Sequence, residues 1–258
     1  MMYWFAFKGI CQREFLRFLS QRSRFLSSLV RPLLWLVVFA AGFRAALGIS
    51  IIEPYATYIN YEEYILPGLC AMILLFNGMQ SSLSIVYDRE MGSMKLLLTS
   101  PLPRPFLLIS KIVATALVSI LQVAAFLIIA WFYGLQLDWL GYLSGIPALF
   151  VTATMLNAMG IVIASNIRQL ENFAGVMNFV IFPMFFMSSA LYPLWKMQEA
   201  SEWLFEICKY NPFTFGVELI RYALYLKINI LAVTVVISAT IIFSIISLIC
   251  LKPEKHWK

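Results

Sequence analysis

Six stretches of about 20 mostly apolar residues constrain this chain more than any other feature of its sequence. A helix needs about 20 such residues to cross the hydrocarbon core of a bilayer, which is about 30 Å thick. Of the 258 residues, 62% are hydrophobic and 12% are charged, against about 25% charged in a soluble domain. This balance excludes a disordered protein, a coiled coil and an ordinary cytosolic enzyme. The sequence predicts an all-α membrane protein with spans at 27–49, 64–87, 107–133, 143–166, 172–192 and 229–251.

The basic residues between these stretches predict how the chain is oriented. When the N-terminus is placed in the cytoplasm, the inner segments and span ends contain 14 of the 19 Lys and Arg residues, and the outer ones contain 5. Because Lys and Arg concentrate on the cytoplasmic side of membrane proteins, both termini are expected there. The chain is thus predicted to be multi-pass in the cell (inner) membrane. Its net charge of +6 then reflects orientation, and nothing indicates nucleic-acid binding.

Cysteine and histidine usage argues against several chemistries. The four cysteines are widely spaced and form no C-x-x-C pair, and His256 is the only histidine. A disulfide framework, a histidine-based metal site and a Ser/His/Asp triad are therefore not expected. We expect no cofactor and no metal in this chain.

Residues 1–26 form a predicted amphipathic helix. On a helical wheel Arg13, Arg17 and Arg24 fall on one side, although Lys8 and Arg22 do not. The opposite side carries Trp4, Phe7, Cys11, Phe15, Phe18 and Phe25. Such a helix lies in the membrane interface with its arginines toward anionic headgroups. It either simply anchors the chain or helps to seat a cytoplasmic partner. It lacks the features of a cleavable signal peptide, so we expect none.

The cytoplasmic loop at 88–106 follows the second predicted span. The run Asp88-Arg89-Glu90 marks the point where that span leaves the lipid. After Gly92, apolar residues recur at helical spacing until Ser100-Pro101-Leu102-Pro103 ends the pattern. We expect a short amphipathic helix here, which is either a plain connection or a docking element for a partner.

The outer segment at 193–228 is long for a connection and is interrupted by Pro193 and Pro212. It contains aromatic residues that favour the membrane interface, namely Trp195, Trp203, Tyr210, Tyr222 and Tyr225. These features predict a pair of short helices that dip back toward the bilayer. An interfacial loop without a dip is the alternative.

Polar residues inside the spans need partners, because lipid offers none. One group is Asn77, Gln80, Ser81 and Ser82, and scattered ones are Gln122, Asn157, Asn166 and Asn178. We expect them to face other helices or a water-filled path, mostly as structural contacts. No carboxylate lies in a span core, which argues against a proton- or sodium-driven carrier. Gly141-x-x-x-Gly145 is a helix-packing pattern and weak evidence of dimerisation.

Three sequence blocks carry a resemblance to a known family. The first is P-G-(x)n-D-R-E-x-G-S-M-K-x-L-x3-P, from Pro67 to Pro101. The others are Met187-Ser-Ser-Ala-Leu-Tyr-Pro-Leu194 and Asn211-Pro-Phe-Thr-Phe-Gly-Val-Glu-Leu-Ile-Arg221. In this order and spacing they resemble the type-2 family of ABC transporter permeases, in its drug, lipo-oligosaccharide and polysaccharide exporter branch.

The resemblance implies a single transmembrane domain over 1–258 with six spans, which pairs with a second copy or a paralogue and binds two cytoplasmic ATPase subunits. The 88–106 loop would couple to the ATPase through Asp88, Arg89, Glu90, Gly92 and Lys95. The outer segment would be a re-entrant hairpin marked by Pro193, Asn211, Pro212, Glu218 and Arg221. The first, second and fifth spans would form the path at the dimer interface. Because the chain has no G-x-x-x-x-G-K-[ST] motif, ATP and Mg would be bound by the partner.

The sequence thus favours the permease subunit of an ATP-driven exporter, which moves an amphipathic, lipid-linked or glycan substrate out of the cytoplasm or inner leaflet. It would not be an enzyme itself. One alternative is a membrane-embedded lipid-modifying enzyme, but Asp88 and Glu90 are the only close acidic pair at the membrane surface and no histidine joins them. A secondary transporter is the other alternative.

Overall fold

The computed structural model describes residues 2–20, 22–43, 54–55, 59–90, 102–167 and 169–250. Ten helices make up the regular structure of these residues. They are α1 (Met2–Ser20), α2 (Arg22–Phe43), α3 (Tyr61–Glu90), α5 (Arg104–Phe132), α6 (Trp139–Asn166), α7 (Leu170–Phe186), α8 (Leu194–Ala200), α9 (Glu202–Tyr210), α10 (Pro212–Leu224) and α11 (Ile230–Cys250). The expected all-α membrane fold is confirmed at this level.

Four helices, α3, α5, α6 and α11, are long and apolar enough to cross a membrane. Two predicted spans correspond to shorter apolar helices. In α2 the apolar part is Ser28–Val38. Helix α7 has 17 residues, or about 26 Å at 1.5 Å per residue, slightly less than the hydrocarbon core. It ends at Phe186 and not near 192, because the backbone leaves the helical conformation at Met187.

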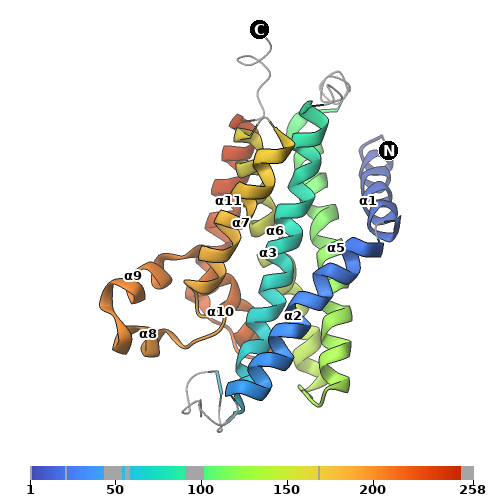
Figure 1. Ribbon diagram of the computed structural model, residues 1–258. Coiled ribbons are helices and arrows are strands. Elements are labelled where there is room, and N and C mark those ends of the chain that lie inside the picture. The colour runs from blue at the N-terminus through green and yellow to red at the C-terminus, as the bar shows by residue number, and fades with distance from the viewer. Residues whose placement is uncertain are drawn as a thin grey trace.

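Helices α3 and α6 form the centre of the bundle, and the other long helices surround them (Figure 1). Both central helices are mostly buried, whereas α11 packs against α6 with most of its surface exposed. Among the predicted polar residues, Asn157 of α6 acts as a structural contact, since its Nδ2 donates to the Ile112 carbonyl of α5 at 3.3 Å. Ser82 also packs internally, at the crossing of α3 with Gly160 of α6.

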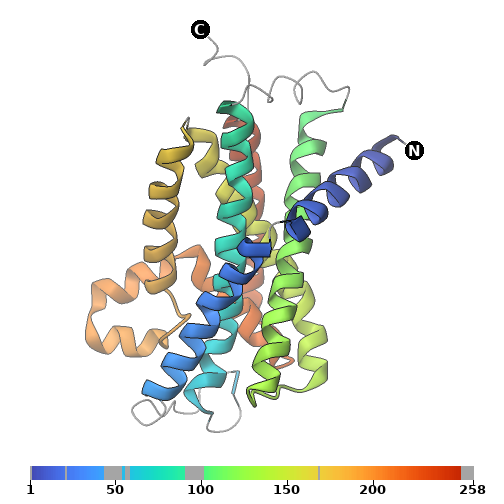
Figure 2. The same ribbon diagram turned by 45° about the vertical axis from the view of Figure 1, so that its right-hand side comes forward.

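The N-terminal helices cover the bundle incompletely. Figure 1 shows that α2 starts beside α5 and then runs downward across α3 in the lower half of the molecule. Helix α1 packs beside α5 and runs obliquely to the long axis of the bundle (Figure 2). Large apolar side chains of α1, such as Trp4, Phe5 and Phe15, are exposed. The upper half of α3 in Figure 1 is therefore not covered by α2.

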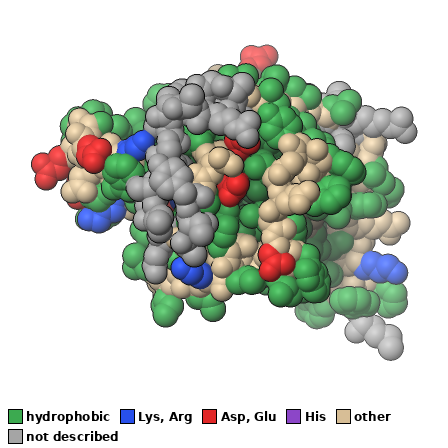
Figure 3. Space-filling view, turned by 90° about the horizontal axis from the view of Figure 1, so that it is seen from below, with side chains coloured by type: hydrophobic (Ala, Val, Ile, Leu, Met, Phe, Trp, Pro, Cys, Tyr) green, Lys and Arg blue, Asp and Glu red, His purple; other side chains and the backbone are tan. Residues whose placement is uncertain are grey.

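Several helix ends gather at the upper end of the bundle in Figure 1. They are the end of α3, the start of α5, the junction of α6 with α7, and the end of α11. At the lower end, Figure 3 shows acidic and basic side chains scattered among hydrophobic ones. The expected amphipathic helix of the 88–106 loop falls on 91–101, outside the described residues.

The outer segment contains three helices, α8, α9 and α10, where a pair was expected. Figure 1 shows α8 and α9 beside the lower half of the bundle, not beyond its lower end. Helix α10 packs against α3, α6 and α11. The Gly141/Gly145 pattern serves this packing within one chain, because a Cβ on Gly141 would overlap the carbonyl oxygen of Leu224 at the end of α10. These glycines are thus already used inside the protomer.

Candidate functional site

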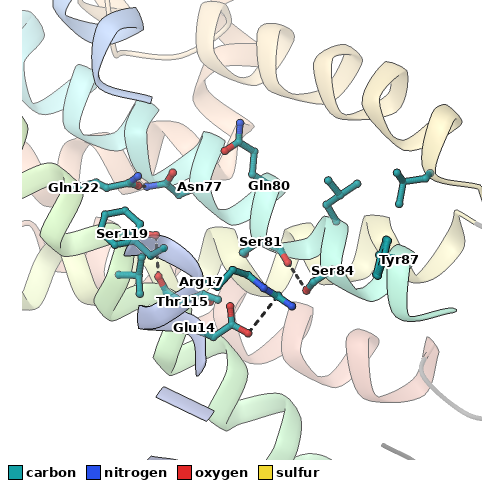
Figure 4. A pocket seen from close by; sticks show the side chains of 14 residues that line it. Glu14, Arg17, Asn77, Gln80, Ser81, Ser84, Tyr87, Thr115, Ser119 and Gln122 are labelled. Carbon is teal, nitrogen blue, oxygen red and sulfur yellow. Dashed lines mark hydrogen bonds and ion pairs between the residues drawn. The ribbon is translucent and has the colours of Figure 1, made fainter. Parts of the chain in front are cut away.

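A polar pocket of about 290 Å³ lies between α1, α3 and α5, and we call it the α1–α3–α5 pocket (Figure 4). One wall comes from α3 and one from α5, and α1 closes the front. The lining residues are Glu14, Arg17, Phe18, Asn77, Gln80, Ser81, Leu83, Ser84, Tyr87, Thr115, Val118, Ser119, Gln122 and Leu170. In a helix bundle of this apolar composition, such a concentration of polar side chains marks a candidate binding site.

The α3 wall follows from helical spacing. Asn77, Gln80, Ser81 and Ser84 recur three or four residues apart and therefore lie on one face of the helix. The Asn77 side-chain amide donates to Oε1 of Gln122 on α5, and Gln122 Nε2 donates to Ser28 Oγ on α2 at 3.0 Å. This chain of hydrogen bonds joins α2, α3 and α5 at the deep end of the pocket.

Most hydroxyl groups of the pocket donate to carbonyls of their own helix. Ser81 Oγ donates to the Gly78 carbonyl at 2.9 Å, Thr115 Oγ1 to the Ile112 carbonyl at 3.0 Å, and Ser119 Oγ to the Thr115 carbonyl at 2.9 Å. A hydroxyl has one hydrogen to donate and two lone pairs that accept. These groups therefore present mainly acceptor oxygens.

The α1 wall contains a buried carboxylate. Glu14 is 7% exposed and lies 3.0 Å from Nη2 of Arg13 and 3.7 Å from Nη1 of Arg17. Two of the three predicted interface arginines thus bind an acid of their own helix, and Arg17 lines the pocket. The third, Arg24, lies on α2, and its side chain is outside the described part.

The predicted coupling residues begin at the end of α3. Glu90 Oε2 accepts a hydrogen bond from the backbone N–H of Leu170 at 3.1 Å. Leu170 is the first residue of α7, and Gln169 before it makes no side-chain cap. Because a helix N-terminus carries partial positive charge and unpaired N–H groups, a carboxylate stabilises it. Glu90 therefore links the end of α3 to the start of α7.

The other predicted coupling residues are only partly visible. Asp88 and Arg89 belong to α3, but their side chains are outside the described part of the chain, and so are Gly92 and Lys95 as a whole. Their role in coupling stays a prediction.

The predicted hairpin residues meet at the turn between α7 and α8. Asn211 caps α10 by accepting from the Phe213 N–H at 3.0 Å. Its Nδ2 also donates to the carbonyls of Met184 and Met187, at 2.8 and 2.7 Å. Pro212 occupies the first turn of α10, where its missing N–H costs nothing. At the other end of the turn, Pro193 is buried and precedes α8.

Arg221 holds the same turn from α10. It is 2% exposed, pairs with Glu218, and donates from Nη2 to the Ser189 carbonyl at 2.7 Å. Its guanidinium lies 4.1 Å from the ring centroid of Tyr64, whose hydroxyl donates to the same carbonyl at 3.0 Å. Burial lowers the pKa of Arg221, but Glu218, Tyr64 and Tyr55 together more than offset this, so its pKa is raised overall and the side chain stays charged.

The sequence interpretation did not select Glu14, Ser84, Thr115 or Ser119 as pocket residues. A signal was present, because Lys111, Thr115, Ser119 and Gln122 recur at helical spacing along α5. Serine and threonine are common in membrane helices as backbone-bonded residues, so their types alone indicated no site. All four cysteines are free, and no group of metal-ligating side chains gathers in the described part of the chain.

Comparison with known proteins places the chain in a family. The family model described as ABC-2 type transporter matches residues 6–225. The chain belongs to the ABC-2 type transporter family. It is 29% identical over 216 residues to a protein of Cyanophora paradoxa named as a putative transport permease, ycf38. The aligned region covers 83% of this chain and 72% of that protein. Proteins with the same name from Porphyra purpurea and Pyropia yezoensis are 27% and 29% identical, over 83% and 86% of this chain and 72% and 74% of their own lengths.

Membership of the ABC-2 family confirms the resemblance found in the sequence. The chain is a multi-pass membrane permease. Transport permeases of this family are not themselves ATPases, and the family works with ABC ATPase subunits.

Proposed function

We propose that this chain is the membrane-spanning subunit of an ATP-driven exporter, and that it moves an amphipathic, lipid-linked or glycan substrate out of the cytoplasm or the inner leaflet. The observation that carries the proposal is the ABC-2 family match over residues 6–225. ATP and Mg are bound by a separate partner, because this chain has no phosphate-binding loop motif.

The protein crosses the cell (inner) membrane six times, through α2, α3, α5, α6, α7 and α11, with both termini in the cytoplasm. The excess of basic residues in the segments assigned to the inside supports this orientation. A short α7 is tolerated because a bilayer thins locally around a helix a few Å too short. The segment from α8 to α10 is a re-entrant hairpin on the outer side, and its position beside the bundle supports this (Figure 1).

Two ATPase subunits bind at the cytoplasmic end, against the 88–106 loop and the N-terminal helix. Movement of the loop reaches α7 through Glu90, which is why the bond to Leu170 supports a coupling role. A rigid connection of this kind transmits a displacement better than a floppy turn does.

Two permease copies, identical or paralogous, pair so that α2, α3 and α7 line the path. The first of these helices exposes Leu34 and Val38, and α7 exposes Phe179 and Phe182. These exposed apolar side chains support a face that another helix or lipid covers. Opening of this face after ATP binding would create the export path.

Affinity purification of the tagged chain from its membrane in mild detergent tests the proposal. A chain with a P-loop motif is expected to co-purify and to hydrolyse ATP. Repeated purification with no nucleotide-binding partner would refute an ATP-driven exporter and favour an enzyme or a secondary transporter.

A further inference from the structure

We infer that a groove on α2, which we call the Arg31 groove, binds the negatively charged group of an amphipathic molecule. The groove has a volume of about 400 Å³ and is lined by Leu26, Val30, Arg31, Leu34 and Trp35. The inference rests on the proposed function, because the groove belongs to the α2–α3–α7 face proposed for the export path. It narrows the cargo to an anionic amphiphile.

The contacts of two lining residues place the groove toward α3 and α7. The guanidinium carbon of Arg31 lies 4.0 Å from the ring centroid of Phe76 on α3. Trp35 follows one turn later on the same face of α2. Its ring centroid lies 5.7 Å from that of Phe185 and 5.5 Å from that of Phe186, both on α7. The groove therefore faces the two helices that line the proposed path together with α2.

The first argument is the depth at which the charge lies. Helix α3 is apolar over Tyr61–Tyr87, and Phe76 lies about 16 Å from Tyr87, the cytoplasmic end of that stretch, at 1.5 Å per residue. The hydrocarbon core is about 30 Å thick, so the guanidinium beside Phe76 lies near its centre. An arginine at the membrane surface would instead reach the lipid headgroups.

The second argument is that this charge has no counter-ion. In the part of the chain that the structure describes, Arg31 forms no ion pair and no hydrogen bond. The Phe76 ring attracts the charge, but a guanidinium has five N–H donors, and these stay available. An ionisable side chain inside the membrane is costly, and one without a partner marks a binding or transport role.

The third argument is the composition of the groove around the charge. Apart from Arg31, its lining residues are aliphatic or aromatic. Leu34 of α2 and Phe182 of α7 are exposed, so the face is open to molecules in the bilayer. The planar donors of a guanidinium fit a carboxylate or a phosphate, and an apolar body would cover the rest of the groove.

The same features exclude two other kinds of ligand. A neutral glycan would leave the charge of Arg31 unpaired. A free inorganic anion would leave the apolar walls uncovered and would have to leave water for the centre of the membrane. An amphiphile with one anionic group satisfies both the charge and the walls.

The experiment is photo-crosslinking of the full chain, purified with its partner ATPase, in nanodiscs of phosphatidylcholine, which has no net charge. The probes are hexadecyl phosphate, hexadecanol and hexadecyltrimethylammonium, each with a diazirine at the same carbon of the alkyl chain. They differ only in the charge of the head. Peptide mass spectrometry locates the labelled helices, and unlabelled hexadecyl phosphate and inorganic phosphate serve as competitors.

The inference predicts that hexadecyl phosphate labels α2 and α7 about tenfold more than the neutral and cationic probes do. Arg31→Gln lowers this labelling by about tenfold or more, as expected for hydrogen bonds to a charged group. Arg31→Lys keeps the charge and retains most of it. Lys227→Gln is the matched control, because Lys227 is a cation exposed in the connection between α10 and α11, and it should change nothing.

A second readout separates binding from a structural role. Removal of an unpaired charge from the membrane removes a cost, so the unfolding midpoint of Arg31→Gln should equal or exceed that of the wild type. A lowered midpoint would show that Arg31 serves packing and would overturn the inference.

Four labelling results would also overturn it. They are equal labelling of α2 and α7 by the anionic and neutral probes in the wild type, unchanged labelling in Arg31→Gln, an equal loss in Lys227→Gln, and displacement of the probe by inorganic phosphate as readily as by hexadecyl phosphate. If the ATPase partner co-purifies and hydrolyses ATP in any of these cases, the permease function stands and only the anion site is lost. Absence of the partner would instead refute the proposed function.

Discussion

Replacement of Arg221 by leucine should destabilise the protein more than any other single change in the outer hairpin. The guanidinium is buried, pairs with Glu218, donates to the Ser189 carbonyl and stacks on Tyr64. Leucine fills part of the volume but removes the donors, so the Glu218 carboxylate and the Ser189 carbonyl lose their bonds to Arg221.

The magnitude follows from burial of the pair. Removing one partner of a buried ion pair costs about 3–5 kcal/mol. Because the Glu218 side chain is 19% exposed, water relieves part of its isolation, and we expect about 3 kcal/mol, the lower end of that range. Arg221→Lys keeps the charge but not the planar fork, so it should cost less than the leucine variant. Glu218→Gln keeps an acceptor and should cost about 1–2 kcal/mol.

The assay is the unfolding midpoint of the purified protein in detergent, followed by tryptophan fluorescence and by loss of the monodisperse peak. A loss of 3 kcal/mol corresponds to about 6–12 °C for a chain of this size. Lys209→Leu is the matched control, because Lys209 and Glu206 also pair three residues apart, but with side chains 48% and 47% exposed. Such a pair contributes about 0–1 kcal/mol. Equal midpoints for Arg221→Leu and Lys209→Leu would refute the assignment of a stabilising role to the buried pair.

Three further predictions concern helix junctions. Glu90→Lys places a cation at the N-terminus of α7, and we expect normal expression and retained ATP hydrolysis but loss of transport. The control Glu199→Lys, at an exposed position of α8, should transport normally. Full transport by Glu90→Lys would contradict the coupling role. Gly141→Val should prevent α10 from packing, because the valine Cβ would overlap the Leu224 carbonyl. A Cβ at Gly9 meets open space, so Gly9→Ala should express like wild type. Equal expression of the two variants would be inconsistent with this packing. Asn211→Ala removes the α10 cap, one bond to Met184 of α7 and one bond to Met187 just after α7, and the unfolding midpoint should reveal a loss of about 1–2 kcal/mol. An unchanged midpoint would count against the junction.

Membrane character, the long helices and their approximate limits could be predicted from the sequence because each depends on local composition. The α7 end could not, since the apolar run continues past Pro183 and only the backbone shows that the helix stops at Phe186. The number of outer helices was also missed, because Ser201 separates α8 from α9 without any proline or glycine to mark the break.

The polar residues expected from the sequence cover the α3 side of the candidate pocket, and Gln122 is the one such residue on its α5 side. Asn77, Gln80 and Ser81 were expected to face helices or a polar path, and they line the pocket. Thr115 and Ser119 of α5 were missed, because their position depends on how two helices are rotated against each other, which a single sequence does not specify. The same holds for Tyr64, whose bond to the Ser189 carbonyl joins residues 125 positions apart. Gly141 illustrates the converse, because the packing pattern was recognised but its partner is α10 of the same chain.

The most direct test of the central claim is ATP hydrolysis by the purified complex in liposomes, compared with the ATPase partner alone. If this chain is the permease of an ATP-driven exporter, assembly with it should change the hydrolysis rate, and liposomes that contain its cargo lipid should stimulate that rate further. Glu90→Lys should abolish the stimulation and leave the basal rate. Identical hydrolysis by the partner with and without this chain, in every lipid composition, would contradict the account.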